Sequence, residues 1–222
     1  MESAFCEPIP ADCRLIETFR YDPSAGAVDL DLHLNRMCDA ARKLGFSFRR
    51  KDAEHLCGGL SSPASLRCRL TLTQEGQFDL QTHALGVTAS QWVLGVSDRR
   101  LRSDDPWLAH KTTERRLYDE TRAALPVGID EILFLNEKDE LCEGTITNVF
   151  VQCADQTWVT PPISSGCLPG ILRQNLIVSR KVRVKVITLD DLRQAVKIRV
   201  GNSLRGLIDA KLAPDALKSF GF

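Results

Sequence analysis

Apolar residues early in the chain recur with two spacings, one typical of strands and one typical of helices. Residues 15–20 predict an extended segment, and residues 23–26 (PSAG) predict a turn. Residues 66–73 alternate between polar and apolar and are followed by Glu75-Gly76, which predicts a strand and a hairpin turn. Between these strands, apolar residues three or four positions apart end at a glycine, so they predict an amphipathic helix with a glycine stop: Leu30, Leu34, Met37, Ala41 and Leu44, then Gly45.

The middle of the chain changes character. Residues 91–96 predict another strand, but the stretch from Ser97 to His110 has little periodicity. It contains three arginines, three aspartates and a proline. This composition predicts an exposed linker between two halves of the molecule.

The second half is richer in predicted strands. Val182, Val184 and Val186 alternate with basic residues, as a half-buried strand requires. Thr188 and Asp191 have the spacing of a capping box, which predicts a short helix through Ala195. The remaining elements mix without strict strand–helix alternation, which favours the α+β class; the predicted strands cover 131–135, 148–152, 157–160, 182–188 and 196–200, and the predicted helices cover 114–125 and 170–178.

Composition narrows the range of functions. The 222 residues carry 29 basic and 29 acidic side chains, so the basic excess that is typical of nucleic-acid binders is missing. No apolar run approaches the roughly 18 residues of a membrane-spanning helix, and the acidic, proline-containing start does not resemble a signal peptide. We therefore expect a cytoplasmic protein with neither a nucleic-acid nor a membrane partner.

Metal chemistry is also not predicted. The eight cysteines are scattered and form no C-x-x-C pair, and the four histidines lack the spacing of metal ligands. The even cysteine count is compatible with disulfides, but a chain of this length without a secretory signal favours free thiols.

One long constellation carries the functional prediction. Residues 143–150 read EGTITNVF, residues 158–162 read WVTPP, and residues 166–173 read GCLPGILR. This order of glutamate, asparagine, aromatic residue, threonine and turn before a basic helix resembles the signature of class IV aminotransferases, which are pyridoxal 5'-phosphate enzymes of fold type IV. Trp158 is a departure, because the family usually has an aliphatic residue there.

The resemblance extends from about residue 14 to about residue 212. It includes residues 16–20 (IETFR), residues 33–37 (HLNRM) and residues 202–206 (NSLRG). It implies an α+β, two-domain fold similar to that of D-amino acid aminotransferase. The expected parts are an N-terminal α/β sandwich-like domain at 1–104, an interdomain linker at 105–112, and a C-terminal β-barrel-like domain with helices at 113–222.

The resemblance also implies a Schiff-base lysine. A pyridoxal enzyme needs a lysine amine that reacts with the cofactor aldehyde and that can then move protons at the substrate carbon. The matching residue is Lys111, at the end of the predicted linker. Taken alone, a lysine at this position would be interpreted as a solvated surface residue.

A carboxylate must keep the cofactor's ring nitrogen protonated. Glu143 matches the family's glutamate, although by itself it would be interpreted as a turn residue. Asn148 has two interpretations, a supporting polar residue of the site or a cap at the end of a strand. Tyr118 resembles a tyrosine that helps to hold the ring, but its spacing from the lysine varies between subgroups.

The cofactor phosphate needs backbone donors and a cation. By resemblance, the amides of Ile171 and Leu172 at a helix N-terminus would bind it, with Ser203 adding a hydroxyl and an amide. Arg36 would supply the positive charge. Without the resemblance, these residues would be interpreted as an ordinary loop-to-helix turn, a turn after a strand and a solvated arginine.

One part of the family pattern is not found. Class IV enzymes usually begin with an additional strand and hairpin, often with Asp-Arg and Gly-Asp-Gly steps, whereas this chain starts close to the E-T-x-R strand. We therefore expect a shortened N-terminal domain and a less predictable substrate pocket. The family also implies a homodimer.

Two stretches distinguish subgroups. Residues 111–119 (KTTERRLYD) and residues 202–206 resemble 4-amino-4-deoxychorismate lyases more than branched-chain or D-amino acid aminotransferases. The leading prediction is a lyase that forms 4-aminobenzoate and pyruvate, with Arg20 and Arg205 as hypothetical binders of substrate carboxylates. The alternatives are a class IV aminotransferase acting on a small amino acid, and a non-catalytic binding protein that keeps the fold.

Overall fold

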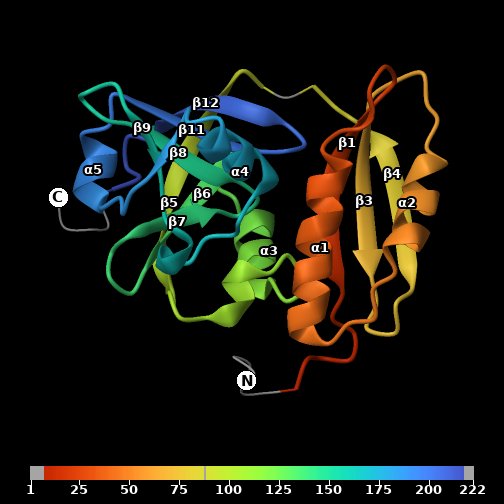
Figure 1. The fold of residues 1–222 in the computed structure, drawn as a ribbon. Coiled ribbons are helices and arrows are strands. Elements are labelled where there is room, and N and C mark those ends of the chain that lie inside the picture. The colour runs from red at the N-terminus through yellow and green to blue at the C-terminus, as the bar shows by residue number, and fades with distance from the viewer. Residues whose placement is uncertain (1–7, 88, 218–222) are drawn as a thin grey trace. The chain divides into compact units, whose positions relative to one another are not determined.

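The computed structural model describes residues 8–87 and 89–217 (Figure 1). Cys6 and the outermost residues of both predicted domains lie outside these ranges. By its contacts the chain divides into two compact units: Met1–Val87 with His110–Glu114, and Thr88–Ala109 with Arg115–Phe222. Each unit has its own sheet.

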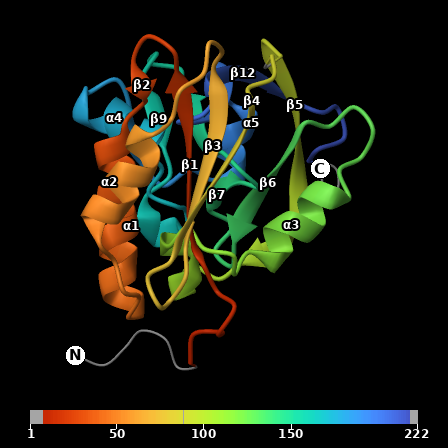
Figure 2. The same ribbon diagram turned by 90° about the vertical axis from the view of Figure 1, so that its right-hand side faces the viewer.

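The first unit is a four-stranded antiparallel sheet with two helices. The sheet order is β2-β1-β3-β4, and both helices lie against the same face of it (Figures 1 and 2). The strands are β1 (Leu15–Asp22), β2 (Gly26–Ala27), β3 (Leu66–Leu72) and β4 (Phe78–Ala84), and the helices are α1 (Leu30–Leu44) and α2 (Arg50–Gly58).

Helix α1 confirms the sequence prediction at both ends. Its apolar stripe faces the sheet, with Leu34 and Met37 fully buried. Gly45 has a φ of 76°, and its N–H donates to the carbonyl of Ala41. This left-handed conformation is one that glycine adopts at little cost, which explains why the helix ends there.

The second unit is an eight-stranded mixed sheet in the order β10-β9-β8-β11-β12-β5-β6-β7. Four of the neighbouring pairs are antiparallel, whereas β5 lies parallel to both β12 and β6, and β10 lies parallel to β9. The elements are β5 (Gln91–Leu101), η1 (Pro106–Ala109), α3 (Arg116–Ala123), β6 (Glu131–Asn136), β7 (Leu141–Gly144), β8 (Asn148–Gln152), β9 (Trp158–Thr160), η2 (Ile163–Ser165), α4 (Ile171–Val178), β10 (Arg183–Val184), α5 (Leu189–Arg193), β11 (Lys197–Asn202) and β12 (Gly206–Leu212).

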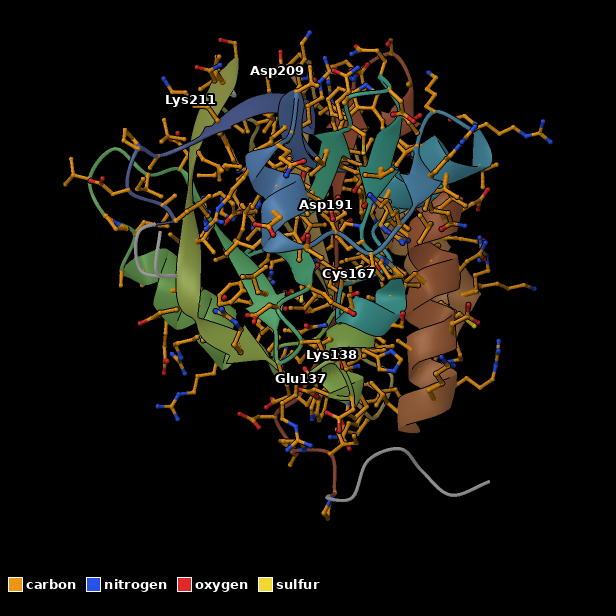
Figure 3. All side chains as sticks on the ribbon, turned by 90° about the vertical axis from the view of Figure 1, so that its left-hand side faces the viewer. Glu137, Lys138, Cys167, Asp191, Asp209 and Lys211 are labelled. Atoms are coloured by element: carbon orange, nitrogen blue, oxygen red, sulfur yellow. The ribbon has the colours of Figure 1, made fainter. Side chains whose placement is uncertain are left out.

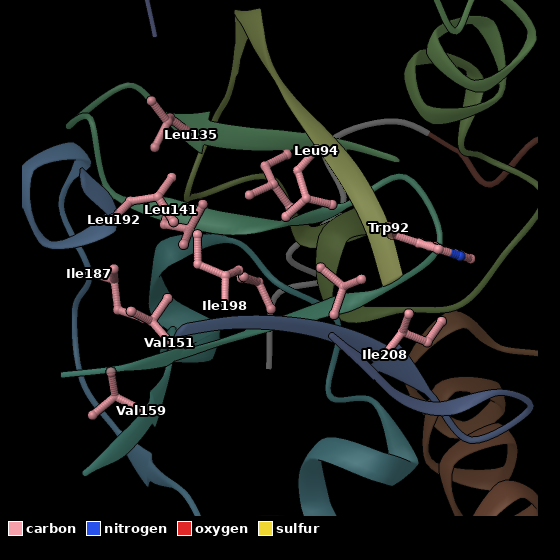
Figure 4. Packing of buried hydrophobic residues seen from close by; sticks show 13 residues of the cluster. Trp92, Leu94, Leu135, Leu141, Val151, Val159, Ile187, Leu192, Ile198 and Ile208 are labelled. Carbon is pink, nitrogen blue, oxygen red and sulfur yellow. The ribbon is translucent and has the colours of Figure 1, made fainter. Parts of the chain in front are cut away.

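A hydrophobic core of the second unit lies on one face of this sheet (Figure 4). Its strand residues stand two apart, as in Leu133 and Leu135 or Val149 and Val151, so they share a face. Leu192 of α5 joins the same cluster. Phe134 and Phe150 occupy the positions between these residues. Phe134 contacts Tyr118 of α3, and Phe150 contacts α4, so these two helices cover other parts of the sheet.

Two sequence predictions were wrong. The stretch from Ser97 to His110 is not an exposed linker, because β5 continues to Leu101 and both Leu101 and Leu108 are buried against Phe134. The buried residues of this stretch stand singly among charged neighbours such as Asp98, Arg99 and Arg100, so they give no periodic pattern. The strand predicted over 182–188 contains only the two residues of β10, which pair with β9. Beyond it the chain turns to β7, where the Leu141 N–H donates to the Ile187 carbonyl and Thr188 forms an isolated bridge with Glu140.

Other predictions hold with shifted boundaries. Strand β8 and the hairpin after β3 are as predicted, and the capping box has both reciprocal hydrogen bonds between Thr188 and Asp191. Helices α3, α4 and α5 are each shorter than predicted. Helix α2 and strands β4, β7 and β12 were not predicted. The mixed sheets and helices confirm the α+β class.

Among the described residues, no helix is long and apolar enough to cross a membrane.

Candidate functional site

Glu143 is a buried carboxylate at the end of β7, surrounded by donors. It is 8% exposed. Its Oε1 accepts a hydrogen bond from the Tyr118 hydroxyl at 2.9 Å, and its Oε2 accepts one from the Leu168 backbone N–H at 3.0 Å. The Asn148 side-chain amide lies 3.5 Å from the same Oε2. These donors offset the cost of removing a negative charge from water.

Asn148 ties this carboxylate to the turn that enters α4. Its Nδ2 also donates to the Leu168 carbonyl at 3.0 Å, so one side chain bridges β8 and residues 168–170. The turn passes so closely that a Cβ on Gly170 would clash with the Asn148 Oδ1. Glycine at this position therefore allows the backbone to reach the asparagine.

Tyr118 lies on α3 between an aromatic partner and a cation. Its ring makes an edge contact with Phe134, with centroids 5.3 Å apart, and the Arg115 guanidinium lies 5.5 Å from its centroid. Burial first, and then the neighbouring Glu143 carboxylate, raise the pKa of Tyr118 well above its usual value. The phenol therefore stays protonated at neutral pH and acts as a donor to Glu143.

Neighbouring thiols do not compete as nucleophiles. Burial, followed by the nearby Glu143 carboxylate, raises the pKa of Cys167 to about 12. Cys142 is also buried, and its pKa is raised for the same two reasons. Because the thiolate is the reactive form, both residues are inert at neutral pH.

Helix α4 begins directly after this turn, with Gly170 as its N-cap residue. Ile171 and Leu172 occupy its first two positions. The first N–H groups of an α-helix have no acceptor within the helix, and the helix dipole adds a partial positive charge there. Gly201 in β11 lies against this end, since a Cβ on it would come within 2.8 Å of the Leu172 side chain.

Ser203 lies in a turn that the preceding asparagine holds in place. The Asn202 Oδ1 accepts from the backbone N–H groups of Leu204 and Arg205, at 3.1 and 3.0 Å. Its Nδ2 donates to the Ile146 carbonyl at 3.1 Å. This side chain therefore joins the turn at residues 202–205 to the loop between Glu143 and Asn148.

Arg36 lies in the first unit, on α1, where it forms a two-pronged ion pair with Glu17 of β1. The Arg36 Nε donates to Oε1 at 2.8 Å and its Nη2 to Oε2 at 2.5 Å. The Nδ1 of buried His33 lies 2.5 Å from the same carboxylate. Burial alone would raise the pKa of Glu17, but Arg36 and His33 outweigh it and hold that pKa down at about 2.

Lys111 also lies in the first unit, on a short segment beside β1. Its backbone carbonyl accepts from the Ile16 N–H at 2.8 Å, and the next residue, Thr112, forms an isolated bridge with Leu15. The Thr113 hydroxyl accepts from the Arg14 N–H. These contacts therefore anchor the backbone at Lys111 next to β1, the strand that carries Glu17.

The two hypothetical substrate binders have other partners. The Arg20 Nη2 donates to Asp22 at 2.8 Å and to Ser65 at 3.0 Å. The Arg205 guanidinium lies 6.0 Å from the Trp92 ring centroid. A surface ion pair, the more common role of an exposed arginine, is what Arg20 forms with Asp22.

The predicted residues thus fall into two groups. In the second unit, hydrogen bonds join Tyr118, Glu143 and Asn148, and Ile171 and Leu172 follow the same turn. Lys111 and Arg36 belong to the first unit. Within the described residues, no group of three or more His, Cys, Asp or Glu side chains could hold a metal ion.

Sequence reasoning missed the partners of these residues. Glu17, the ion-pair partner of Arg36, stands in the quoted E-T-x-R strand without a role assigned to it. A carboxylate at an alternating position of a strand otherwise rich in apolar residues was the available signal. The Leu168 N–H could not be found in this way, because a backbone donor has no sequence signature.

Comparisons with known proteins agree on the family. The model of the family described as Amino-transferase class IV matches residues 14–212. A relative from Schizosaccharomyces pombe named "Putative aminodeoxychorismate lyase" is 25% identical over 204 residues, covering 87% of this chain and 87% of its own.

Solved structures share the fold. A "Putative amino-acid aminotransferase" from Mesorhizobium loti is 39% identical with a TM-score of 0.86, and the match covers 91% of this chain and 100% of that one. A "Putative 4-amino-4-deoxychorismate lyase" from Legionella pneumophila is 24% identical with a TM-score of 0.81, covering 91% of this chain and 84% of that one, and shows the fold alone.

The contact at Gly170 is testable by Gly170→Ala. The added methyl group must displace the Asn148 side chain, so we expect a loss of about 1–3 kcal/mol in the free energy of unfolding, as for other overpacked sites. Urea unfolding measures this loss. Gly58→Ala is the matched control, because a Cβ there meets nothing within 4 Å. Equal stability of Gly170→Ala and the wild type would contradict the close contact.

The Glu17 ion pair predicts acid sensitivity of the first unit. The folded-state pKa of about 2 lies below the ordinary value of 4.5. The pair therefore stabilises the fold above about pH 4.5, and this contribution, on the order of 3 kcal/mol, is lost as the pH falls toward 2. Amide exchange of β1 and α1 between pH 6 and pH 2.5 measures the effect. Glu17→Gln should flatten this pH dependence of amide exchange. The control is Asp12→Asn, a change at an exposed carboxylate, which should not alter the pH dependence. If the pH dependence in Glu17→Gln equals that of the wild type, the assignment is contradicted.

Proposed function

Because the chain belongs to the class IV amino-transferase family, whose members are enzymes that depend on pyridoxal phosphate, we propose that it is a 4-amino-4-deoxychorismate lyase. The reaction would divide this substrate into 4-aminobenzoate and pyruvate. The observation that carries the proposal is the buried Glu143 carboxylate, held among donors beside the N-terminus of α4.

The residues of the second unit fit the cofactor chemically. A protonated ring nitrogen needs a negative acceptor that is shielded from water, and Glu143 is such an acceptor. An anionic phosphate needs convergent backbone donors, which the first turn of α4 offers. The glycines at positions 170 and 201 allow backbone to approach closely at this end. We assign the ring contact to Glu143, supported by Tyr118 and Asn148.

We assign the phosphate contacts to the amides of Ile171 and Leu172, with Ser203 and Arg36 as further binders. The two hydrogen bonds to Glu17 hold the Arg36 guanidinium in one orientation. Less side-chain entropy is then lost when the guanidinium binds an anion. The Asn202 hydrogen bonds do the same for the turn that carries Ser203.

Lys111 is proposed to attach the cofactor and then to move a proton. When bound, pyridoxal phosphate draws electrons from the substrate carbon that carries the amine. The Lys111 amine would take the proton from that ring carbon, and a proton would return to the methylene carbon of the departing enolpyruvyl group. The two products contain every atom of the substrate, so no second substrate is needed.

The lyase reaction is favoured by the turn at residues 202–205. Its Asn-Ser pair resembles the lyase subgroup, whereas branched-chain aminotransferases carry Gly-Thr at these positions. In this chain the Asn202 side chain makes three hydrogen bonds that a glycine could not make. The relative from Schizosaccharomyces pombe supports the same reaction through its name.

A class IV aminotransferase is the second candidate. It is favoured by the 39% identity to the Mesorhizobium loti protein, whose name specifies an amino-acid aminotransferase. Transamination would use the same lysine, glutamate and phosphate contacts, but it requires an oxo-acid acceptor. The family resemblance also supports a homodimer, which sedimentation of the purified protein would test.

The first experiment tests the cofactor and the lysine. Purified protein mixed with pyridoxal phosphate should show a visible absorption band that borohydride abolishes, and peptide mapping should then find the reduced cofactor on Lys111. In Lys111→Ala this linkage should be absent and turnover should fall by about 10²–10⁴-fold.

The control is Lys211→Ala, since Lys211 is an exposed lysine on β12. This variant should behave like the wild type. If the wild-type protein shows no band, the chain is better explained as a non-catalytic binding protein that has kept the fold.

The second experiment separates the two reactions. In the lyase case, the cofactor-loaded protein converts 4-amino-4-deoxychorismate to 4-aminobenzoate and pyruvate in equal amounts, without an added oxo acid. In the aminotransferase case, product forms only when an amino acid and an oxo acid are both present. Product analysis by chromatography decides between them, and the second outcome would overturn the lyase proposal while leaving the cofactor site intact.

A further inference from the structure

The second unit contains another buried carboxylate besides Glu143. Glu131 is the first residue of β6 and is 0% exposed. The rest of this strand is apolar up to Asn136. A carboxylate at such a position is costly unless donors surround it, so its partners show what it does in the fold.

Those partners come almost entirely from one loop. The Glu131 Oε1 accepts from the Thr145 N–H at 3.0 Å and the Thr145 hydroxyl at 2.5 Å. Its Oε2 accepts from the Ile146 N–H at 3.2 Å and the Thr147 hydroxyl at 3.0 Å. The N–H of Ile132 completes the set at 3.1 Å. Every partner is a donor, which is the arrangement that an ionised carboxylate requires.

Helix α3 is connected to the same loop. The Arg122 Nη1 lies 3.5 Å from the Glu131 Oε1, and the Arg115 Nη2 donates to the Thr145 carbonyl at 2.7 Å. Gly144 passes so close that a Cβ on it would lie 2.8 Å from the Glu131 carboxyl carbon. The loop therefore has little room to shift without breaking these contacts.

This loop is the connection between the two polar residues of the candidate site. Thr145 stands two residues after Glu143, and Thr147 stands one residue before Asn148. We propose that Glu131 is a positioning residue of the cofactor site: by holding residues 145–147 it fixes where the Glu143 carboxylate and the Asn148 amide lie. The inference rests on the proposed cofactor-binding role of Glu143.

Glu131→Gln is the direct test, because the variant keeps the size of the side chain. Its amide NH₂ must face either the Oε1 donors or the Oε2 donors, and either choice sets donor against donor. We expect affinity for pyridoxal phosphate to fall by about 10- to 100-fold, the range seen when a partner that orients a ligand side chain is removed. The pH dependence of the bound cofactor's absorption should shift in the same direction as in Glu143→Gln.

The matched control is Glu137→Gln. Glu137 lies just beyond the other end of β6, on the surface beside Lys138 (Figure 3). It also accepts hydrogen bonds from a loop, through the backbone N–H and the hydroxyl of Ser103. This variant should keep the wild-type cofactor affinity and spectrum.

A double-mutant cycle separates positioning from general stability. If Glu131 acts through Glu143, the Glu131→Gln change should alter cofactor affinity by less than about twofold in a Glu143→Gln background. The proposal is overturned if the full loss remains in that background. It is equally overturned if Glu131→Gln lowers only the melting temperature and leaves cofactor affinity and spectrum unchanged.

Failure of the proposed function has a different signature. In that case Glu143→Gln would itself bind pyridoxal phosphate with wild-type affinity and spectrum. If Glu143→Gln is impaired and Glu131→Gln is not, the cofactor assignment stands and the role of Glu131 fails.

A second pair of variants decides the matter if Glu131→Gln does not fold. Thr147→Val removes one donor to Glu131 without changing the shape of the side chain, and Thr147→Ser keeps that hydroxyl. We expect Thr147→Val to weaken cofactor binding several-fold and Thr147→Ser to restore it to within about twofold of the wild type. Equal cofactor affinity in the two variants would refute the positioning role.

Discussion

A buried negative charge must be surrounded by donors, and this constraint organises both units. Glu143 and Glu131 in the second unit and Glu17 in the first are each at most 8% exposed. Each is satisfied by groups from segments distant in the sequence, as when Tyr118 and Leu168 both donate to Glu143. The carboxylates therefore join strands, loops and helices that the hydrophobic core alone would leave free to slide.

The constraint also explains why the second unit is built from two different kinds of contact. Apolar residues such as Leu133 and Val149 pack one face of the sheet without specifying any direction. Hydrogen bonds to Glu131 and Glu143 require particular donors at particular places. Packing thus accounts for the existence of the sheet, whereas the carboxylates account for the conformation of the loop between β7 and β8 and of the turn before α4.

Much of the fold was predictable wherever one periodicity acts alone. Helix α1 has an uninterrupted stripe and a terminal Gly45, and both of its ends were predicted. The prediction failed where charge and alternation conflict, as from Ser97 onward, because the burial of Leu101 depends on Phe134. It also failed after Val184, because the chain leaves β9 there and Ile187 and Thr188 bond to the edge of β7 instead, and alternation alone does not tell which neighbour a residue pairs with.

The sequence motif pointed to the polar residues of the candidate site, but not to the residues that hold them in place. A motif supplied Glu143 and Asn148, since residue type and spacing are visible in the sequence. Glu131 bonds to the motif across 14 to 16 positions, and residue type and spacing do not reveal such a contact. Its one local signal is a carboxylate that opens an otherwise apolar strand, which could equally mark the end of an exposed strand.

The distinction between the motif residues and the residues that hold them also bears on the choice between the two candidate reactions. Both candidate reactions need a protonated ring nitrogen, a bound phosphate and a mobile proton on a lysine, so the carboxylates and α4 serve either one. What separates the reactions must lie where the substrate's own groups are recognised. The turn held by Asn202 differs between the subgroups, and the Asn202 side chain ties it through Ile146 to the loop that Glu131 holds. The hydrogen bonds of Glu131 and the side chain of Asn202 therefore meet at the same loop, at residues 145–147.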